Sequence, residues 1–287
     1  GSFHTNPGKS IFGSIGDSAP DRWGRVLMRR ANFLKSQKDK ITPRSMSEID
    51  YLLGVNDESR IGALRFSTEP NGPYLSSTNT RSIPPLIELP KLLSASDNFT
   101  KNEEDEDDLK LLLAPGSSLG GARPKASIKD NNKKLAIAKF PRHDDEYSVT
   151  LWEALALSIA KLAEIPTPSW CIENITSKPV LIIKRFDRNK LGRVPFISAM
   201  SMLGANDNEH HSYLEIVDAI RQFGANPTND ITNLWKRIVF NILISNTDDH
   251  LRNHGFLFKS TEGWSLSPMY DVNPTPTSIK PRSLTTA

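Results

Sequence analysis

A dense group of polar residues lies between two apolar runs near the end of the chain. The stretch from Ser245 to Phe256 holds two carboxylates, two histidines, an arginine and two amides, and it follows the apolar run 238–244. Side chains this polar add little to a hydrophobic core, so they should lie on a loop between rigid elements, where catalytic groups are common. We therefore expect the chemistry of this protein to centre on this loop.

The spacing within this loop indicates which chemistry it could perform. Asp248 and Asn253 are five positions apart, the Asp-x-x-x-x-Asn separation of a kinase catalytic loop, in which Asp accepts the proton of the attacking hydroxyl and Asn holds magnesium. A second metal carboxylate should follow on a nearby strand, and Asp271 is placed for that role. The transition state of phosphoryl transfer is loose and anionic, so it requires positioning and charge neutralisation by residues of these types.

Two other interpretations of the loop remain open at this point. Asn-Thr-Asp-Asp at 246–249 is also typical of a turn that caps a helix. His250 and His254 are four apart, the spacing of zinc-binding histidines on a helix, but that motif requires a Glu after the first His. Asn253 and Gly255 also disfavour a helix here.

Composition bounds the class of protein. A chain of 287 residues with 37% hydrophobic and 24% charged residues can form two globular lobes with a sizeable core. It contains no apolar run near 18 residues, so we expect no transmembrane helix. The only cysteine, Cys171, excludes an internal disulfide and fits a reducing cytoplasm. A net charge of +3 is too mild to indicate nucleic-acid binding, and Gly1-Ser2 resembles a cloning remnant, not a signal sequence.

The N-terminal part predicts a helix after Gly16. Asp17 or Ser18 is a plausible N-cap, and Pro20 falls in the first turn. One face of this helix is apolar, and the other carries Arg22, Arg25, Arg29 and Arg30. Such a basic face is either simply solvated or a contact for an acidic partner or nucleic acid. Further along we expect short helices at 45–53 and 87–93, a strand at 61–66, and an acidic linker or helix start at 102–108.

A glycine-rich stretch at 116–128 is the second candidate site. Its glycines permit a tight turn that brings backbone amides close to a phosphate, and Arg123 and Lys125 add positive charge. The stretch is not a Walker A loop because Gly-Lys-Ser/Thr is missing. Taken alone, it is equally compatible with a simple hairpin turn.

A lysine and a glutamate form the third candidate site. Residues 134–141 alternate as a strand with Lys139 near its end, and Glu153 lies in an apolar helix predicted at 151–162. A strand lysine oriented by a helix glutamate is the kinase device that holds nucleotide phosphates. The simpler alternative is that both side chains lie on the surface and have no catalytic role. The three candidate sites follow one another in the order found in kinases, which argues against this alternative. A buried strand should follow at 180–188, and helices at 213–223 and 231–245.

Together these stretches resemble the HipA family of bacterial toxin kinases. The matching segments, in the order of the family and over nearly the whole chain, are 17–24, 118–125, 138–141, the helix of Glu153, 184–188, 246–253 and 266–272. Each segment alone is weakly specific, whereas the ordered set is specific. Family members carry a further small β-rich segment before residue 11 and more helical structure after Val272.

The resemblance implies a role for each matched residue. Asp248 would be the general base, and Asn253 and Asp271 the magnesium ligands. Lys139, oriented by Glu153, would hold the phosphates of ATP. The remaining nucleotide-binding residues would be Gly120, Gly121, Ala122, Arg123, Pro124 and Lys125 over the phosphates, Lys184, Arg185 and Phe186 at the adenine hinge, and His250 and Tyr270 lining the site. Ser118 matches the autophosphorylated serine of the family, and Ser117 in the same loop is an alternative.

The resemblance also implies a fold and a function. We expect an α+β, two-lobed protein-kinase-like fold, with an N-terminal subdomain at 1–115, a nucleotide-binding part at 116–188 and a helical C-lobe at 189–287. The implied activity is that of a Ser/Thr protein kinase toxin that uses ATP and Mg²⁺, with an aminoacyl-tRNA synthetase as target and growth arrest as outcome. A HipB-like DNA-binding antitoxin would be its partner and would place it on DNA indirectly. The alternatives are a kinase-fold binding module that acts as a repressor partner, and a small-molecule phosphotransferase.

Overall fold

The chain forms two compact units. The computed structural model describes residues 4–5, 11–77, 83–118, 120–206, 209–259 and 262–275. One unit, here called the sheet unit, comprises 18–150 and 170–185. The other, here called the loop unit, comprises 1–17, 151–169 and 186–287. The domain boundaries expected from the sequence remain predictions.

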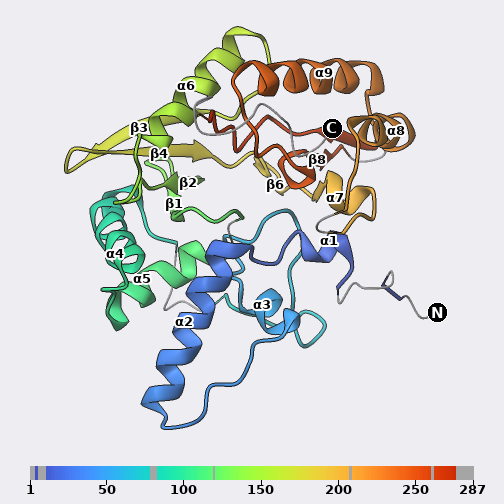
Figure 1. Ribbon diagram of the computed structural model, residues 1–287. Helices are drawn as coiled ribbons and strands as arrows, with labels where there is room; N and C mark the ends of the chain where they lie inside the picture. The colour runs from blue at the N-terminus through green and yellow to red at the C-terminus, as the bar shows by residue number, and fades with distance from the viewer. Residues whose placement is uncertain are drawn as a thin grey trace. The chain divides into compact units, whose positions relative to one another are not determined.

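The sheet unit combines helices with a four-stranded antiparallel sheet of order β1-β2-β4-β3 (Figure 1). Its elements are α2 (Arg22–Lys38), α3 (Glu48–Gly54), the 3₁₀ turn η1 (Leu86–Glu88), α4 (Leu89–Lys101), α5 (Glu106–Gly116), β1 (Lys125–Lys129), β2 (Leu135–Lys139), β3 (Trp170–Ile175) and β4 (Lys178–Lys184). The register places Ala126 of β1 opposite Ala138 of β2, and Ala138 opposite Ile182 of β4.

The core of this unit follows from strand alternation. Every second residue of the strands points to one face of the sheet, and Ala126, Ala138 and Ile182 on that face are buried in one apolar cluster. Buried residues of α2, α4 and α5, among them Leu27 and Leu92, complete the same cluster. The small side chains of the alanines leave room for the leucines of the helices. The sheet that carries Lys139 is therefore held by three helices.

The predicted elements of the sheet unit are confirmed in part. The strand expected at 134–141 and the strand expected at 180–188 are present as β2 and β4, and the acidic run begins α5, where Asp105 and Asp108 form a capping box. The helix expected at 45–53 is α3, capped by Ser47, and the one expected at 87–93 extends to Lys101.

Two sequence-based predictions in this unit are wrong. The N-cap of α2 is Asp21, not Asp17 or Ser18, and the helix starts at Arg22. Residues 61–66 form no strand. Gly62 has a φ of 70° there, and Arg65 turns to pair with Asp57 at 2.5 Å and to lie over the Tyr74 ring at 3.4 Å. Contacts with residues on either side of this segment thus override its alternating pattern.

The loop unit combines helices with short antiparallel strands. Its elements are α1 (Gly13–Gly16), α6 (Val149–Leu162, whose first two residues belong to the sheet unit), β5 (Arg188–Asn189), β6 (Gly192–Arg193), β7 (Phe196–Ser198), α7 (Ala199–Met202), α8 (Tyr213–Phe223), α9 (Pro227–Leu243), the 3₁₀ turn η2 (Leu251–Asn253), β8 (Gly255–Phe258) and β9 (Trp264–Leu266). Strands β7, β8 and β9 form an antiparallel sheet in that order. The helices expected at 151–162, 213–223 and 231–245 correspond to α6, α8 and α9.

The core of the loop unit fixes the two ends of the polar loop. Ile216 of α8, Leu234 of α9, Leu251 and Phe256 belong to one buried cluster. The polar loop follows α9 and precedes β8, so both of its ends are anchored to packed elements. In the part of the chain that the structure describes, no helix is long and apolar enough to cross a membrane.

Candidate active site

The end of α9 sets the direction of the polar loop. The helix stops at Leu243, and Ser245 takes a left-handed conformation with φ of 58°. The amide of Asn246 then donates to the carbonyl of Asn241 at 2.9 Å, and the two side chains join through Asn246 Nδ2 and Asn241 Oδ1 at 3.1 Å. Both residues are buried. This closed turn leads the chain out of the helix toward Asp248, which is exposed.

The structure brings Asp248 and Asn253 together. Asn253 Nδ2 donates to the backbone carbonyl of Asp248 at 2.9 Å, and the amide of Asn253 donates to the carbonyl of His250 at 2.8 Å. Asn253 is buried whereas Asp248 is exposed. The loop therefore closes on the side-chain amide of Asn253 and leaves the carboxylate of Asp248 accessible to a substrate.

The neighbouring carboxylate, Asp249, has a structural environment instead. Asp249 Oδ2 accepts a hydrogen bond from Tyr213 of α8 at 2.6 Å, and Asp249 contacts His254 Nε2 at 3.1 Å. Burial alone would raise the pKa of Asp249, but the charge of His254 and hydrogen bonds from His254, Tyr213 and Asn241 together lower it. Asp249 thus ties the loop to α8 and to the start of β8, a role that sequence reasoning missed. Its position beside Asp248 was the only signal in the sequence.

The segment after β9 carries Asp271 in a strained backbone conformation. Asp271 has a φ of 56°, in the left-handed region that only a few per cent of non-glycine residues adopt. The preceding Tyr270 donates its hydroxyl to the carbonyl of Arg252 at 2.5 Å, and burial raises the pKa of that phenol. Its ring lies 5.5 Å from the ring of Phe186. The Asp271 segment is therefore connected directly to the polar loop and to the residue predicted at the end of the hinge.

A buried arginine fixes the start of the same segment. Arg237 of α9 donates Nη2 to the carbonyl of Ser267. Its side chain is almost fully buried, and burial lowers its pKa to about 10. The sequence did not predict this contact, because the position of an arginine in an amphipathic helix does not indicate that its side chain points inward.

The glycine-rich loop is shaped by its own backbone and by Lys125. Gly121 has a φ of 76°, and a Cβ at this position would lie 2.8 Å from Lys125 Nζ, so only glycine fits without strain. Lys125 Nζ donates to the carbonyl of Gly120 at 2.5 Å. Gly120 is exposed, as is Ala122, and Pro124 is buried at the entrance to β1. The loop is thus folded on itself between α5 and β1.

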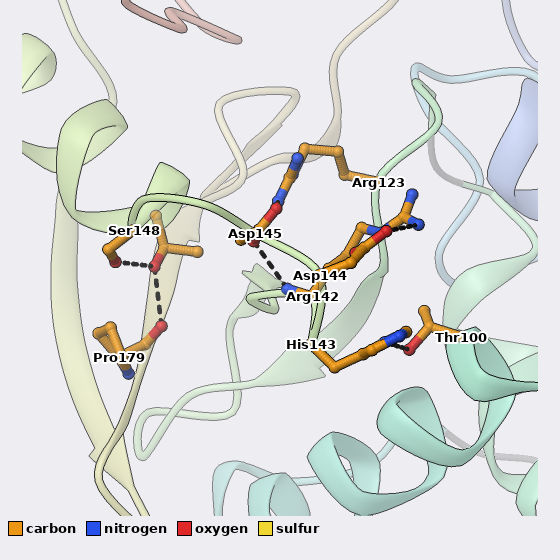
Figure 2. Close-up of polar contacts among 9 residues, drawn as sticks. Thr100, Arg123, Arg142, His143, Asp144, Asp145, Ser148 and Pro179 are labelled. Carbon is orange, nitrogen blue, oxygen red and sulfur yellow. Dashed lines mark hydrogen bonds and ion pairs between the residues drawn. The ribbon is translucent and has the colours of Figure 1, made fainter.

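Arg123 of this loop is paired within the sheet unit. Figure 2 shows the side chains of Arg123 and Asp145 pointing toward one another, and their ion pair measures 2.5 Å. Asp145 also accepts from the backbone amide of Arg142 at 2.8 Å. The sequence predicted Arg123 as a positive charge over the phosphates, and the structure anchors that charge to the segment that follows β2.

The two candidate serines differ in their contacts. Ser117 Oγ accepts from the amide of Asn56 at 3.2 Å and donates to the carbonyl of Ala114 at 3.2 Å. Ser118 is also buried, but its hydroxyl has no hydrogen-bond partner among the described residues. The hydroxyl of Ser117 therefore has a structural role that the hydroxyl of Ser118 does not share among the described residues.

The remaining predicted residues lie as follows. Lys139 ends β2 opposite Lys125 and Leu181. Lys184 is exposed at the end of β4, and Arg185 Nη1 donates to the carbonyl of Ser59 at 2.9 Å. Glu153 is buried on α6 in the loop unit, whereas Lys139 belongs to the sheet unit, so their pairing remains a prediction.

The predicted metal ligands, Asn253 and Asp271, are an amide and a carboxylate. Asn253 and Asp271 offer oxygen ligands, which Mg²⁺ prefers, and the bond from Asn253 Nδ2 to Asp248 leaves Oδ1 as the acceptor of that amide. These residues fit magnesium. Zinc fits poorly, because a 3₁₀ turn and not an α-helix separates His250 from His254, and His254 is buried against Asp249.

Comparisons with known proteins identify a family for this chain. The family model described as the HipA-like C-terminal domain matches residues 117–287. A protein named "Putative kinase" from Haemophilus influenzae is 30% identical over 108 residues, which cover 33% of this chain and 32% of that protein. "Putative kinase Y4mE" from Sinorhizobium fredii is 22% identical over 152 residues, covering 48% of this chain and 34% of that protein. The chain thus spans about a third of the length of these curated relatives.

A solved structure has a similar fold. HipA in a complex with HipB and operator DNA from Shewanella oneidensis superimposes with a TM-score of 0.63 at 17% identity, covering 92% of this chain and 68% of that one. The fold is therefore the mixed α/β, kinase-like fold expected from the sequence. The chain belongs to the HipA-like C-terminal domain family, as the resemblance predicted.

Proposed function

We propose that this chain is a serine/threonine protein kinase of the HipA type, the toxin of a toxin–antitoxin system. The observation that carries the proposal is the loop in which Asn253 closes on the carbonyl of Asp248 while the carboxylate of Asp248 stays exposed. Membership of the HipA-like family and the strained Asp271 support it.

Asp248 is the general base of this proposal. Its carboxylate accepts the proton of a substrate serine or threonine hydroxyl as the oxygen attacks the γ-phosphorus of ATP. The buried network of Asp249, Tyr213 and His254 holds the loop at both ends, so that Asp248 does not have to be ordered during the reaction. Asp249 does not act as the base, because its carboxylate is enclosed by donors.

The other residues bind and orient the nucleotide. Asn253 and Asp271 hold Mg²⁺, which neutralises charge on the phosphates when bound. Lys139, oriented by Glu153, and the backbone of Gly120 to Lys125 hold the phosphates of ATP. Lys184 to Phe186 contact the adenine, and His250 and Tyr270 line the same site. The ring of Phe186 beside Tyr270 supports this placement for the loop unit.

The protein substrate, the partner and the regulation follow from the same family relationship. The substrate is a component of translation, with an aminoacyl-tRNA synthetase as the first candidate, and a HipB-like antitoxin binds the kinase and connects it to DNA. Autophosphorylation of Ser118 silences the enzyme, because a phosphate there cannot share the glycine-rich loop with the phosphates of ATP. The buried and unpartnered hydroxyl of Ser118 among the described residues supports this serine over Ser117.

Transfer of labelled γ-phosphate tests the proposal. The native protein, with ATP and Mg²⁺, should label serine or threonine in a cell extract or in a purified aminoacyl-tRNA synthetase, and Asp248→Asn should not. Absence of transfer by a protein that binds ATP tightly would favour the binding-module alternative. Transfer to an added small molecule but to no protein would favour a small-molecule phosphotransferase.

A further inference from the structure

The N-terminal end of α2 contacts the glycine-rich loop directly. Asp21 Oδ2 accepts the backbone amide of Gly121 at 2.8 Å, although the two residues are a hundred positions apart. The backbone amide of Trp23 donates to the carbonyl of Gly121 at 3.0 Å. Both peptide groups of Gly121 are thus bonded to the first turn of α2.

The indole of Trp23 adds a second attachment at the other side of the loop. Trp23 Nε1 donates to the carbonyl of Lys125 at 2.8 Å, where the loop enters β1. Trp23 is buried in the core beside Leu27, so its position is fixed by packing. The next residue, Gly24, lies so close to the loop that a Cβ there would meet the carbonyl of Ser117 at 2.6 Å. The loop therefore contacts α2 at Ser117, Gly121 and Lys125.

The carboxylate of Asp21 is used on the loop and not on its own helix. Asp21 is the N-cap of α2 and has the extended backbone of a cap, but its side chain makes no capping hydrogen bond. Ser47 and Asp105, the N-caps of α3 and α5 in the same unit, do make one. A side-chain cap stabilises a helix by about 1 kcal/mol, so α2 lacks a stabilisation that its own cap residue could supply. This contrast indicates that the position of Asp21 serves the loop.

We propose that Asp21 and Trp23 are positioning residues that fix the conformation of the glycine-rich loop and thereby its binding of nucleotide phosphates. The inference rests on the proposed function for the identity of the ligand. The motif that begins α2, which the catalytic proposal leaves without a role, then has one. Neither residue has to touch the nucleotide, since both act through the backbone of Gly121 and Lys125.

Hydrogen exchange and nucleotide binding test the proposal together. Asp21→Ala removes the acceptor, and Trp23→Phe removes only the indole donor while keeping an aromatic ring in the core. In the absence of nucleotide, the peptide that contains 120–125 should exchange its amides about 10-fold faster in either variant, because a hydrogen bond of this kind contributes about one decade. ATP should bind about 10-fold more weakly, with adenosine affinity unchanged, since adenosine has no phosphates.

Ser47→Ala is the matched control. It removes an actual N-cap in the same unit and lowers stability by about 1 kcal/mol, so it shows what a general loss of stability does to both readouts. It should change neither the exchange of the 120–125 peptide nor the ratio of ATP to adenosine affinity. Arg22→Ala, an exposed neighbour on α2, should also leave both unchanged.

Three results would overturn the inference: unchanged exchange of the loop in Asp21→Ala and Trp23→Phe, equal losses of ATP and adenosine affinity, or tighter ATP binding. Failure of the proposed function has a different signature, in which the native protein binds neither nucleotide. The exchange experiment contains no nucleotide, so it still decides in that case whether Asp21 and Trp23 fix the loop.

Discussion

Asn253 donates its side-chain amide to the backbone carbonyl of Asp248 at 2.9 Å, so the residue predicted as a metal ligand also holds the residue predicted as the base. The two roles are compatible because the amide has a donor nitrogen and an acceptor oxygen. This hydrogen bond keeps Asp248 and Asn253 in a fixed relation before a substrate arrives.

Replacement of the base should abolish activity without unfolding the protein. Asp248→Asn keeps the shape of the side chain and removes its ability to accept a proton, so phosphoryl transfer should fall by at least about 100-fold. Asp248 is exposed, and the free energy of unfolding should change by no more than about 0.5 kcal/mol. Initial rates and urea unfolding of the two proteins measure both quantities. An active variant would rule out Asp248 as the base.

Replacement of the neighbouring carboxylate, Asp249, should instead lower the free energy of unfolding. Asp249→Asn removes a buried carboxylate that Tyr213 and His254 contact, and it should cost roughly 1–3 kcal/mol at pH 7. The native fold lowers the pKa of Asp249. The ionised carboxylate therefore stabilises the fold at pH values above about 4, the pKa of an aspartate in the unfolded chain. This stabilisation is lost as the pH falls through the lower pKa of the native state. The stability difference between the native protein and the variant should therefore narrow below about pH 4.

Urea unfolding of both proteins between pH 7 and pH 3 measures that difference, with Asp248→Asn as the exposed control that shows none. A difference that stays constant or widens on acidification would contradict the role given to Asp249.

The sequence predicted the local elements well and the long-range contacts poorly. The alternation at 134–141 and the helical spacing at 213–223 correspond to β2 and α8, because those patterns arise from burial of one face of each element. The N-cap of α2 was misplaced because the carboxylate of Asp17 accepts from the amide and hydroxyl of Ser198, both at 2.7 Å and 181 positions away. No sequence window contains both partners.

The same limit applies to the candidate site. Asp248, Asn253 and Asp271 were predicted from their spacing and order, and the structure places Asp248 and Asn253 in contact within one loop. Tyr213 and Arg237, which fix the surroundings of these residues, lie on α8 and α9 and look like ordinary helical residues in the sequence. Only the tertiary fold turns their polar groups inward.

Substitution of the two loop serines should change the free energy of unfolding by different amounts. Ser117→Ala removes the acceptor of the Asn56 amide and the donor to the Ala114 carbonyl, and it should lower the free energy of unfolding by about 1–3 kcal/mol, because two buried hydrogen bonds are lost. Ser118→Ala removes a buried hydroxyl that has no partner among the described residues, so stability should stay the same or rise slightly. Thermal unfolding measures both, and a loss in Ser118→Ala equal to that in Ser117→Ala would contradict the assignment.

The strained backbone at Asp271 should also be measurable. Because non-glycine residues pay about 1 kcal/mol or more for a left-handed conformation, Asp271→Gly should be more stable than Asp271→Ala by roughly that amount. Both variants should lose the dependence of ATP affinity on Mg²⁺, since both lack the carboxylate. Calorimetric titration with and without Mg²⁺ reports the second effect. Equal stability of the two variants would argue against strain, and retained Mg²⁺ dependence would argue against Asp271 as a ligand.

Phosphate transfer by this chain is best tested by measuring the mass of the intact protein. The masses of the native protein, Asp248→Asn and Ser118→Ala are recorded before and after incubation with ATP and Mg²⁺. We expect the native protein to gain the mass of one phosphate, mapped to Ser118, and neither variant to gain any. A starting mass that already includes the phosphate would support the same conclusion. An unmodified native protein that gains no phosphate, or a gain that Asp248→Asn shares, would contradict it.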